Sequence, residues 1–319
     1  MKAVYIDQNG GPEALKYGEM PKPEPTPGHA VVKIAAAGVN FIDVYQRSGL
    51  YKLPLPAILG SEGAGTVESG TQFKKGDRVA WAMSRGSYAQ YALVPEAMLV
   101  PLPETIEFRD GAAVMLQGMT AHYLTHSSYP LKPGDTALIH AAAGGTGLLL
   151  VQMAKLAGAR VIGTTSSQEK ADLARKAGAD EMILYSTQDF VAETKRLTGG
   201  KGVDVVYDSV GATTLMKSLD CVKPRGMAVS FGQSSGAVPA FEPLLLTQKG
   251  SLFFTRPSLQ HYIADRKELE WRASDIFKWL AQKKLALRAE HTYSLAEAEQ
   301  AHRDIEGRRT TGKLVLLIS

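Results

Sequence analysis

The sequence predicts an α/β protein in which a β-rich domain accompanies a doubly wound parallel sheet. Two observations support this prediction. From about residue 127 onward, short apolar segments typical of strands alternate with segments typical of helices, which is the order found in parallel sheets with helical crossovers. Before that point, short segments of strand composition follow one another and are separated by turn signals.

Residues 142–147 form a glycine-rich turn between a predicted strand (136–141) and a predicted helix (148–156) that is apolar on nearly every face. The turn reads Ala-Ala-Gly-Gly-Thr-Gly, which has the spacing of the dinucleotide-binding pattern with alanine in the first glycine position. Gly144 allows the backbone to approach a pyrophosphate, and Gly147 allows the helix to pack closely on the strand. Free N–H groups at the helix N-terminus favour an anion. Together, these features favour dinucleotide binding over an ordinary glycine-rich turn.

Length and composition restrict the class of protein. The chain has 319 residues, enough for two domains, and its net charge of +4 is too small and too scattered to indicate nucleic-acid binding. The single cysteine, Cys221, excludes an internal disulfide and a cysteine-rich metal site. Because the N-terminus lacks a secretion signal and no run of about 20 apolar residues occurs, we expect a cytoplasmic protein without a membrane span.

The first 122 residues are expected to form a barrel-like domain. Candidate strands cover residues 3–6, 30–36, 57–68, 77–83 and 88–94, with proline- and glycine-rich turns between them. Residues 110–125 then have the apolar pattern of a helix that leads into the second domain.

The second part has six candidate strands, the number in a full doubly wound dinucleotide domain. The strands are residues 136–141, 160–165, 182–185, 203–208, 227–231 and 252–255, and the helices are 148–156, 168–177, 189–198, 213–222 and 244–248. The tail, with a helix at 265–283, a strand and helix near 292–297 and a strand at 314–318, is expected to rejoin the first domain. We therefore expect one domain from residues 1–124 and 264–319, another from 125–263, and the active site in the cleft between them.

The end of the second strand indicates which cofactor is bound. NAD sites usually place a carboxylate there to hold the ribose 2′-hydroxyl, whereas this chain has Thr-Thr-Ser-Ser at 164–167 followed by Lys170. Glu169 and Asp172 are expected to lie in the helix that follows. Hydroxyls and a lysine suit an added 2′-phosphate, so the sequence favours NADPH, although Lys170 alone could be a solvated helix residue.

Several motifs resemble those of the zeta-crystallin type of quinone oxidoreductase, in the medium-chain dehydrogenase/reductase superfamily. They are Ala-Ala-Gly-Val-Asn-Phe-Ile-Asp-Val-Tyr at 36–45, Gly-Ser-Glu-Gly-Ala-Gly at 60–65, the segment 111–122, the glycine turn, and the segments 206–211, 229–236 and 249–259. The resemblance covers essentially the full length. It implies a GroES-like domain, a Rossmann domain with a six-stranded parallel sheet, and a homodimer joined through the nucleotide-binding domains.

The resemblance also implies roles for individual residues. Asn40 and Tyr45 would line the nicotinamide end, and Lys313 would reach the cofactor from the tail. Gly144, Gly145, Thr146 and Gly147 would form the pyrophosphate turn, Ser166 and Lys170 would hold the 2′-phosphate, Tyr185 would flank the adenine, Ser209 would face the ribose, and Phe231, Phe254 and Thr255 would wall or bond the nicotinamide. Tyr185 and Phe231 could instead be core aromatics, and Lys313 a solvated strand residue.

No metal site is expected. Zinc alcohol dehydrogenases of the same superfamily use cysteine at the position of Asn40 and a His-Glu pair near residue 61, where this chain has Ser61 and Glu62. The seven histidines show no ligand spacing, and His140 is expected to be a core or turn histidine. Without a Lewis acid the acceptor must be activated by its own chemistry, which favours NADPH-dependent reduction of a small quinone. Asn40, Tyr45 and Tyr51 are the candidate catalytic residues.

Two alternatives remain open. An NADPH-dependent enone or enal reductase would share these motifs. A non-enzymatic protein that binds RNA under control of NADPH, or that serves as a structural protein, belongs to another class, but the sequence shows no basic stripe with interleaved aromatics. Cys221 is expected to be a buried, inert thiol.

Overall fold

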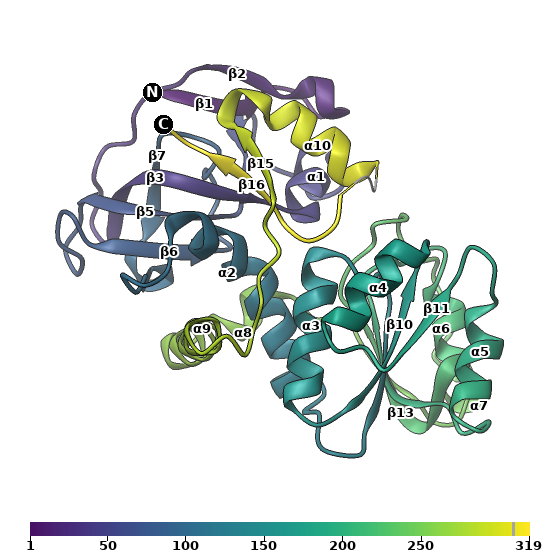
Figure 1. Ribbon diagram of the computed structural model, residues 1–319. Helices are drawn as coiled ribbons and strands as arrows, with labels where there is room; N and C mark the ends of the chain where they lie inside the picture. The colour runs from purple at the N-terminus through teal and green to yellow at the C-terminus, as the bar shows by residue number, and fades with distance from the viewer. Residues whose placement is uncertain (308–309) are drawn as a thin grey trace. The chain divides into compact units, whose positions relative to one another are not determined.

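A computed structural model describes residues 1–307 and 310–319. The chain divides into two units, each with its own core. Unit 1 contains Met1–Met119 and Tyr262–Ser319, and unit 2 contains Thr120–His261 (Figure 1). The C-terminal tail therefore belongs to the same unit as the N-terminal residues.

Unit 1 is built on a seven-stranded sheet in the order β15-β16-β3-β5-β6-β8, with β7 also paired to β3. The two C-terminal strands extend this sheet, because β16 pairs antiparallel with β3. A smaller sheet has the order β2-β1-β4. The strands are β1 (Lys2–Ile6), β2 (Lys16–Glu19), β3 (His29–Val39), β4 (Ala57–Ile58), β5 (Glu62–Ser69), β6 (Arg78–Ala82), β7 (Tyr91–Pro95), β8 (Val100–Pro101), β15 (His291–Ser294) and β16 (Leu314–Leu317). The main helices are α1 (Phe41–Arg47), α2 (Phe108–Tyr123), whose last turn belongs to unit 2, α9 (Arg266–Ala281) and α10 (Ala298–Glu306). The short helix α8 (Leu259–Tyr262) lies where the chain returns from unit 2 to unit 1.

Two expectations for unit 1 were wrong in detail. The predicted strand 57–68 is two strands, β4 and β5, because Gly60 turns the chain with a φ of 90°. The strand β2 was not predicted, since its sequence Lys-Tyr-Gly-Glu has no run of apolar or β-branched residues. The predicted helix at 110–125 is α2, which continues into a π-helical turn at Leu124–Ser128.

Unit 2 is a six-stranded, all-parallel sheet in the order β11-β10-β9-β12-β13-β14. This is the doubly wound order, with the switch of direction between β9 and β12, and it confirms the predicted fold class. The strands are β9 (Thr136–Ile139), β10 (Arg160–Thr165), β11 (Glu181–Leu184), β12 (Val203–Asp208), β13 (Val222–Ser230) and β14 (Phe253–Thr255). The helices are α3 (Gly145–Leu156), α4 (Gln168–Lys176), α5 (Phe190–Leu197), α6 (Leu215–Ser218) and α7 (Leu244–Gln248).

One helix of unit 2 is shorter than expected. The predicted helix 213–222 is α6 followed by a single 3₁₀ turn at Leu219–Cys221, and Val222 already belongs to β13. Residues 224–226, which include a proline and a glycine, lie inside that strand, as an irregularity in its pairing with β12 where Arg225 has a φ of 60°. A bulge therefore accommodates the proline and glycine without ending the strand.

Burial agrees with the predicted role of Cys221. The thiol belongs to the core cluster of unit 2, and burial raises its pKa to about 12, so it is not a nucleophile at neutral pH. Among the described residues, no helix combines the length and the apolar character needed to cross a membrane.

Candidate functional site

The glycine turn of unit 2 joins β9 to α3 and contains all the residues predicted for the pyrophosphate. Gly144 is the N-cap, and the first intrahelical bond runs from the N–H of Leu148 to the carbonyl of Gly144 at 2.9 Å. The N–H groups of residues 145–147 therefore precede the helical hydrogen bonds and are directed out of the helix end. A Cβ at Gly147 would overlap the carbonyl oxygen of Ala141, which explains the close packing that the sequence predicts.

The residues predicted for the 2′-phosphate and adenine lie together at one edge of this sheet. Ser166 follows β10 and Tyr185 follows β11, two strands whose ends are paired. The hydroxyl of Ser186 donates to the carbonyl of Ser166 at 2.9 Å, which ties the two loops together. Lys170 lies in the first turn of α4, and Tyr185 is 44% exposed. Glu169 is in α4, as expected, so no carboxylate ends β10.

On the other side of the switch point, the predicted residues lie just after the ends of β12 and β13 and within β14. The N–H of Phe231 donates to the carbonyl of Asp208 at 2.8 Å, so Ser209 and Phe231 begin adjacent loops. Thr255 ends β14. Phe254, in contrast, packs on the core cluster of unit 2, where its ring meets that of Phe241 edge to face at 5.3 Å between centroids.

Below the glycine turn lies a buried polar network that sequence reasoning did not predict. His140 is 2% exposed, with Nδ1 at 2.9 Å from Oγ1 of Thr164 and Nε2 at 2.9 Å from Oγ of Ser218. The Ser218 hydroxyl donates to Oδ2 of Asp208 at 2.9 Å. Because that hydroxyl has one proton, His140 donates to it through Nε2–H. Burial lowers the pKa of His140, although the Asp208 carboxylate opposes the shift, so the imidazole is neutral at neutral pH. The network joins the ends of β9, β10 and β12.

In unit 1, Asn40 is the N-cap of α1 and its side chain is 3% exposed. Its Nδ2 donates to Oε1 of Glu62 at 2.7 Å, and its Oδ1 accepts from Nζ of Lys313 at 2.7 Å. Lys313 also forms an ion pair with Glu62, and both side chains are fully buried. The structure thus brings two predicted residues, Asn40 and Lys313, together around a buried carboxylate.

The sequence around this carboxylate leaves room for the ion pair. A Cβ at Gly38 would overlap the Glu62 carboxylate and lie 2.7 Å from Cε of Lys313. The other carboxylate oxygen of Glu62 accepts the backbone N–H of Leu116 at 2.6 Å. Burial lowers the pKa of Lys313, and the neighbouring Glu62 carboxylate opposes that shift.

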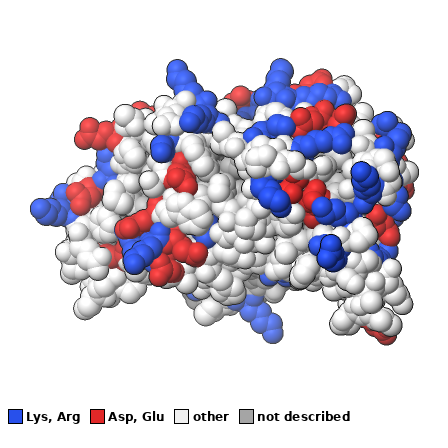
Figure 2. All heavy atoms as spheres, turned by 90° about the horizontal axis from the view of Figure 1, so that it is seen from below, with Lys and Arg blue, Asp and Glu red and all other residues white. Residues whose placement is uncertain are grey.

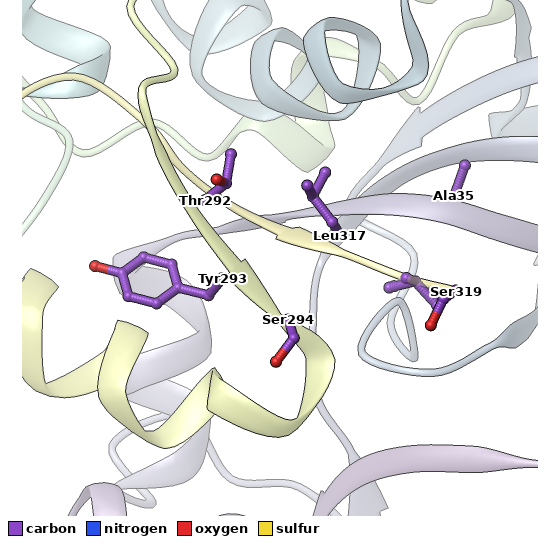
Figure 3. Close-up of a pocket in the computed structure, with 7 residues that line it drawn as sticks. Ala35, Thr292, Tyr293, Ser294, Leu317 and Ser319 are labelled. Atoms are coloured by element: carbon purple, nitrogen blue, oxygen red, sulfur yellow. The ribbon is translucent and has the colours of Figure 1, made fainter.

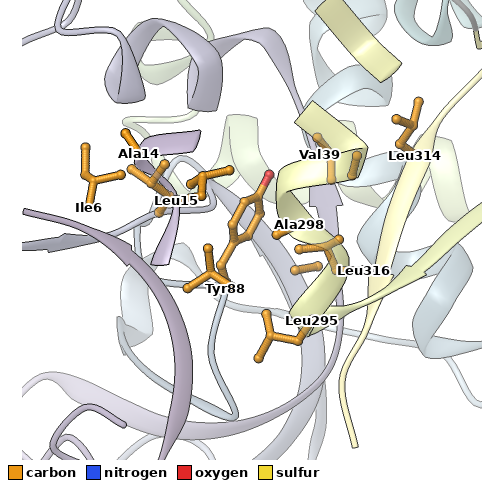
Figure 4. Close-up of a cluster of buried hydrophobic side chains, with 13 residues drawn as sticks. Ile6, Ala14, Leu15, Val39, Tyr88, Leu295, Ala298, Leu314 and Leu316 are labelled. Atoms are coloured by element: carbon orange, nitrogen blue, oxygen red, sulfur yellow. The ribbon is translucent and has the colours of Figure 1, made fainter. Parts of the chain in front are cut away.

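A second series of buried hydrogen bonds connects α1 to α10. The hydroxyl of Tyr88 lies 3.2 Å from Oδ2 of Asp43 and 3.2 Å from Nε2 of His302. Arg47 lies 2.9 Å from Nδ1 of His302 and forms an ion pair with Glu306 at 2.8 Å. Figure 4 shows Tyr88 within the apolar cluster of unit 1, so these hydrogen bonds pass through a core and not along a solvated surface.

The direction of donation along these hydrogen bonds follows from Arg47, which can only donate. An arginine only donates, so His302 accepts through Nδ1 and carries its proton on Nε2, which donates to Tyr88. Tyr88 in turn donates to Asp43. Burial, with Arg47 acting in the same direction, lowers the pKa of His302 to about 3, so the imidazole is neutral.

Asp43, in the first turn of α1, is the final acceptor of these hydrogen bonds. It also accepts the backbone N–H of Asn40 at 2.9 Å and the hydroxyl of Ser61 at 2.7 Å. Burial raises the pKa of Asp43 to about 6, while these donors oppose the rise. The spacing of Asn40 and Asp43, an N-cap and an acidic residue three positions later, is a signal that could have found this contact; no local signal marks His302.

Tyr45 and Tyr51 form an aromatic surface next to Asn40. Their rings meet edge to face, with centroids 5.3 Å apart, and the N–H of Tyr51 donates to the carbonyl of Tyr45 at 2.9 Å. Tyr51 is 38% exposed, and Phe41 extends the surface at 6.0 Å from Tyr45. These rings can contact a flat ligand by stacking.

A shallow pocket of unit 1 holds none of the predicted residues. It lies on strands β15 and β16 and is lined by Ala35, Thr292, Tyr293, Ser294, Leu317, Ile318 and Ser319 (Figure 3). The hydroxyl of Tyr293 donates to Asp304 at 2.8 Å, so its lining side chains offer little chemistry for a reaction.

Comparison with known proteins gives consistent matches along the chain. Residues 26–104 match the alcohol dehydrogenase GroES-like domain, and residues 145–276 match the zinc-binding dehydrogenase family. The chain is 47% identical to a quinone oxidoreductase of Pseudomonas aeruginosa, with 99% of both chains covered, and 42% identical to a 2-haloacrylate reductase of Burkholderia sp, with 99% of this chain and 98% of that protein covered. The structure of Escherichia coli quinone oxidoreductase complexed with NADPH matches with a TM-score of 0.97 at 42% identity, covering 99% of this chain and all of that one.

The residues of unit 1 do not fit the zinc that one family description mentions. At the compared positions stand Asn40 and Ser61, which are poor zinc ligands, and Glu62, whose carboxylate already binds the ammonium group of Lys313. Within residues 1–307 and 310–319, no three or more His, Cys, Asp or Glu side chains are grouped so that they could hold a metal ion.

Proposed function

Since the chain belongs to the quinone oxidoreductase family of the medium-chain dehydrogenase/reductase superfamily, we propose that it is a zinc-independent, NADPH-dependent reductase of a small quinone. The observation that carries the proposal is the Asn40–Glu62–Lys313 network. In this network the ammonium group of Lys313 lies beside the residues that stand where a zinc enzyme has its metal ligands. The side chains of this site therefore do not provide a Lewis acid. A quinone suits such a site because its reduced form is aromatic and delocalised.

The choice of NADPH over NADH rests on the end of β10. A carboxylate at this point would repel a 2′-phosphate, and here hydroxyl side chains are followed by Ser167, the N-cap of α4, and by Lys170 in its first turn. Ser166 and Lys170 would hold the 2′-phosphate, and Tyr185 would cover the adenine. Residues 144–147 would bind the pyrophosphate through backbone N–H groups.

Reduction of a quinone to a hydroquinone adds one hydride and one proton, and NADPH supplies the hydride when bound. Within unit 2, Ser209, Phe231 and Thr255 would position the nicotinamide. In unit 1, Tyr45 and Tyr51 would hold a flat acceptor and exclude water, so the main contribution of the chain is proximity. Asn40 is held by Glu62 and Lys313 and would orient the reacting groups.

A second candidate function is the reduction of a carbon–carbon double bond next to a carbonyl group. The similarity to a protein named 2-haloacrylate reductase favours this alternative, because an acrylate is such a compound. The enolate that forms must be protonated, which would require one of the two tyrosines to act as a donor.

We also propose a homodimer joined through unit 2. The outer strand β14 has an unpaired edge and carries Phe253, which is 58% exposed, and the nearby helix α7 carries Leu244, which is 59% exposed. A second copy of the chain would cover these side chains. Sedimentation of the wild type as a dimer, and of Phe253→Glu as a monomer, would support the proposal; a monomeric wild type would exclude it.

A role in RNA binding has less support. On the face shown in Figure 2, acidic side chains lie among the basic ones, so this face has no continuous stripe of positive charge. Backbone recognition of single strands requires such a stripe.

The test is steady-state oxidation of NADPH, beside NADH, with an ortho-quinone and a linear enone as paired acceptors. Turnover of the quinone with NADPH is the expected result, and Lys170→Ala should weaken NADPH binding roughly tenfold without affecting NADH, because one charged phosphate contact is lost. Turnover of the enone alone would replace the quinone assignment by the second candidate function. Tight NADPH binding without turnover of either acceptor would contradict both enzyme assignments.

A further inference from the structure

Gln117 in α2 is joined to the Asn40 network through one end of its side chain only. Its Nε2 lies 3.4 Å from Oδ1 of Asn40. Its Oε1 is buried and has no hydrogen-bond partner among the described residues. In native structures few buried polar atoms lack a hydrogen-bond partner, and such an atom often marks a binding site or a bound water.

The orientation of the Gln117 amide is fixed by the charges behind it. Glu62 only accepts when ionised and Lys313 donates, so Asn40 must direct Nδ2 to Glu62 and Oδ1 to Lys313. A Gln117 side chain turned the other way would place its oxygen against the oxygen of Asn40. The ion pair therefore orients Asn40, Asn40 orients Gln117, and the carbonyl of Gln117 remains as the free acceptor.

Gln117 is also the most accessible member of this network. Its exposed fraction is 9%, against 3% for Asn40, 1% for Lys313 and 0% for Glu62. The Oε1 atom itself is enclosed, so a donor reaches it when a neighbouring side chain moves aside.

We propose that Gln117 is a specificity-determining residue whose side-chain carbonyl accepts a hydrogen bond from an N–H or O–H group of the bound ligand. The inference rests on the proposed function, which offers two sources of this chemistry: the carboxamide of the nicotinamide and the hydroxyl of the reduced acceptor. Both present a donor that a buried carbonyl can accept.

The test compares pairs of probes that differ in the donor. One pair is NADPH and its reduced 3-acetylpyridine analogue, which lacks the carboxamide N–H groups. The other pair is 2,3-dihydroxynaphthalene, as a stand-in for a hydroquinone, and 2,3-dimethoxynaphthalene. Dissociation constants are measured by fluorescence titration for the wild type, for Gln117→Met and for Gln117→Glu.

Gln46→Met is the matched control. Gln46 is 7% exposed, lies in the same unit and, among the described residues, also has a buried Oε1 without a partner, but its side chain does not belong to the Asn40 network. Thermal unfolding of all variants shows whether each is folded before binding is compared.

For one pair, the wild type should prefer the donor probe about fivefold, the value of one neutral hydrogen bond. In Gln117→Met this preference should fall towards one, while Gln46→Met retains it. In Gln117→Glu the protonated carboxyl can donate to Asn40 and keep its carbonyl in place, so the preference should return as the pH is lowered. The pair that responds identifies the source of the donor.

If the wild type binds both pairs and Gln117→Met leaves both preferences unchanged, a buried water rather than the ligand satisfies Oε1 and the inference is overturned. If the wild type does not bind NADPH, the proposed function itself fails and the inference fails with it. These two results are distinguished by the wild-type titration alone.

Discussion

The two units stabilise buried polar side chains by different means. Unit 1 buries charges and pairs them, as in Lys313 with Glu62, and Arg47 with the partly exposed Glu306. In unit 2, the network below the glycine turn contains a neutral histidine and the carboxylate of Asp208, which accepts the backbone N–H groups of residues 210 and 211 at 2.8 and 3.0 Å. The network of unit 1 therefore depends on matched charges from distant segments, whereas in unit 2 the buried carboxylate is held in part by backbone N–H groups close to it in sequence.

This difference has consequences for tolerance to change. A buried pair that loses one member leaves an uncompensated charge, which is strongly unfavourable. Loss of the neutral His140 would leave unsatisfied hydroxyls, a smaller cost. Four predictions test this comparison.

The largest effect is expected for Lys313→Met. The variant should lose about 3–5 kcal/mol of unfolding free energy, because the Glu62 carboxylate would remain buried without its cation. Urea denaturation measures the loss. The double variant Lys313→Met with Glu62→Gln should be more stable than the single variant, since it removes the stranded charge; additive losses would show that the ion pair is not coupled.

The second expectation concerns Asp43 and pH. Burial raises its pKa in the folded chain to about 6, above the value near 3.9 of an unfolded chain. Between these values the folded state binds the proton more tightly, so its stability falls as the pH rises, by about 3 kcal/mol over two units. Asp43→Asn lacks this titration.

The measurement for Asp43 is the difference in unfolding free energy between the wild type and Asp43→Asn from pH 4 to 7. This difference should decrease as the pH rises. If it increases instead, the donors Asn40, Ser61 and Tyr88 outweigh burial and keep the carboxylate ionised throughout.

The contrast between the units also explains what the sequence could predict. In unit 2, the ends of the strands and the residues that follow them could be predicted from the sequence, because apolar runs and glycine turns are local signals. The six strands, the glycine turn and the absence of a carboxylate after β10 all follow from short segments. The error in the helix at 213–222 arose where a bulge let a proline and a glycine remain within β13.

In unit 1 the site is assembled from residues far apart in sequence. The resemblance to a known family predicts that Asn40 and Lys313 belong to the site. Their shared contact with Glu62 was not predicted, because Glu62 and Lys313 are 251 residues apart in the sequence. Arg47 and His302, which are also in contact, are 255 residues apart in the sequence. No local pattern encodes such pairings, so the network and the role of Gln117 became visible only in the folded chain.

A third substitution probes unit 2. His140→Phe should cost about 2 kcal/mol, because the hydroxyls of Thr164 and Ser218 each lose a partner. Burial holds the pKa of His140 below its ordinary value, so the wild type should lose stability as the pH falls through about 6.5, where the unfolded histidine takes up a proton.

For His140→Phe, the free-energy advantage of the wild type over the variant should therefore shrink on acidification, the direction opposite to that expected for Asp43. A loss as large as that of Lys313→Met would mean that the two networks are alike. An advantage that grows on acidification would mean that His140 carries charge in the folded chain.

The smallest effects are expected at exposed helix caps, where the units should not differ. In unit 2 the side chain of Asp189 accepts the N–H groups of Val191 and Ala192 at 2.8 and 2.9 Å, and in unit 1 Asp265 caps α9 in the same way at 2.8 and 3.2 Å. Replacing either aspartate by alanine should cost about 1 kcal/mol. Equal losses would place the difference between the units in their buried networks alone. A markedly larger loss in one unit would show that the units also differ at their surfaces, and the contrast drawn from Lys313 and His140 would then need to be corrected for it.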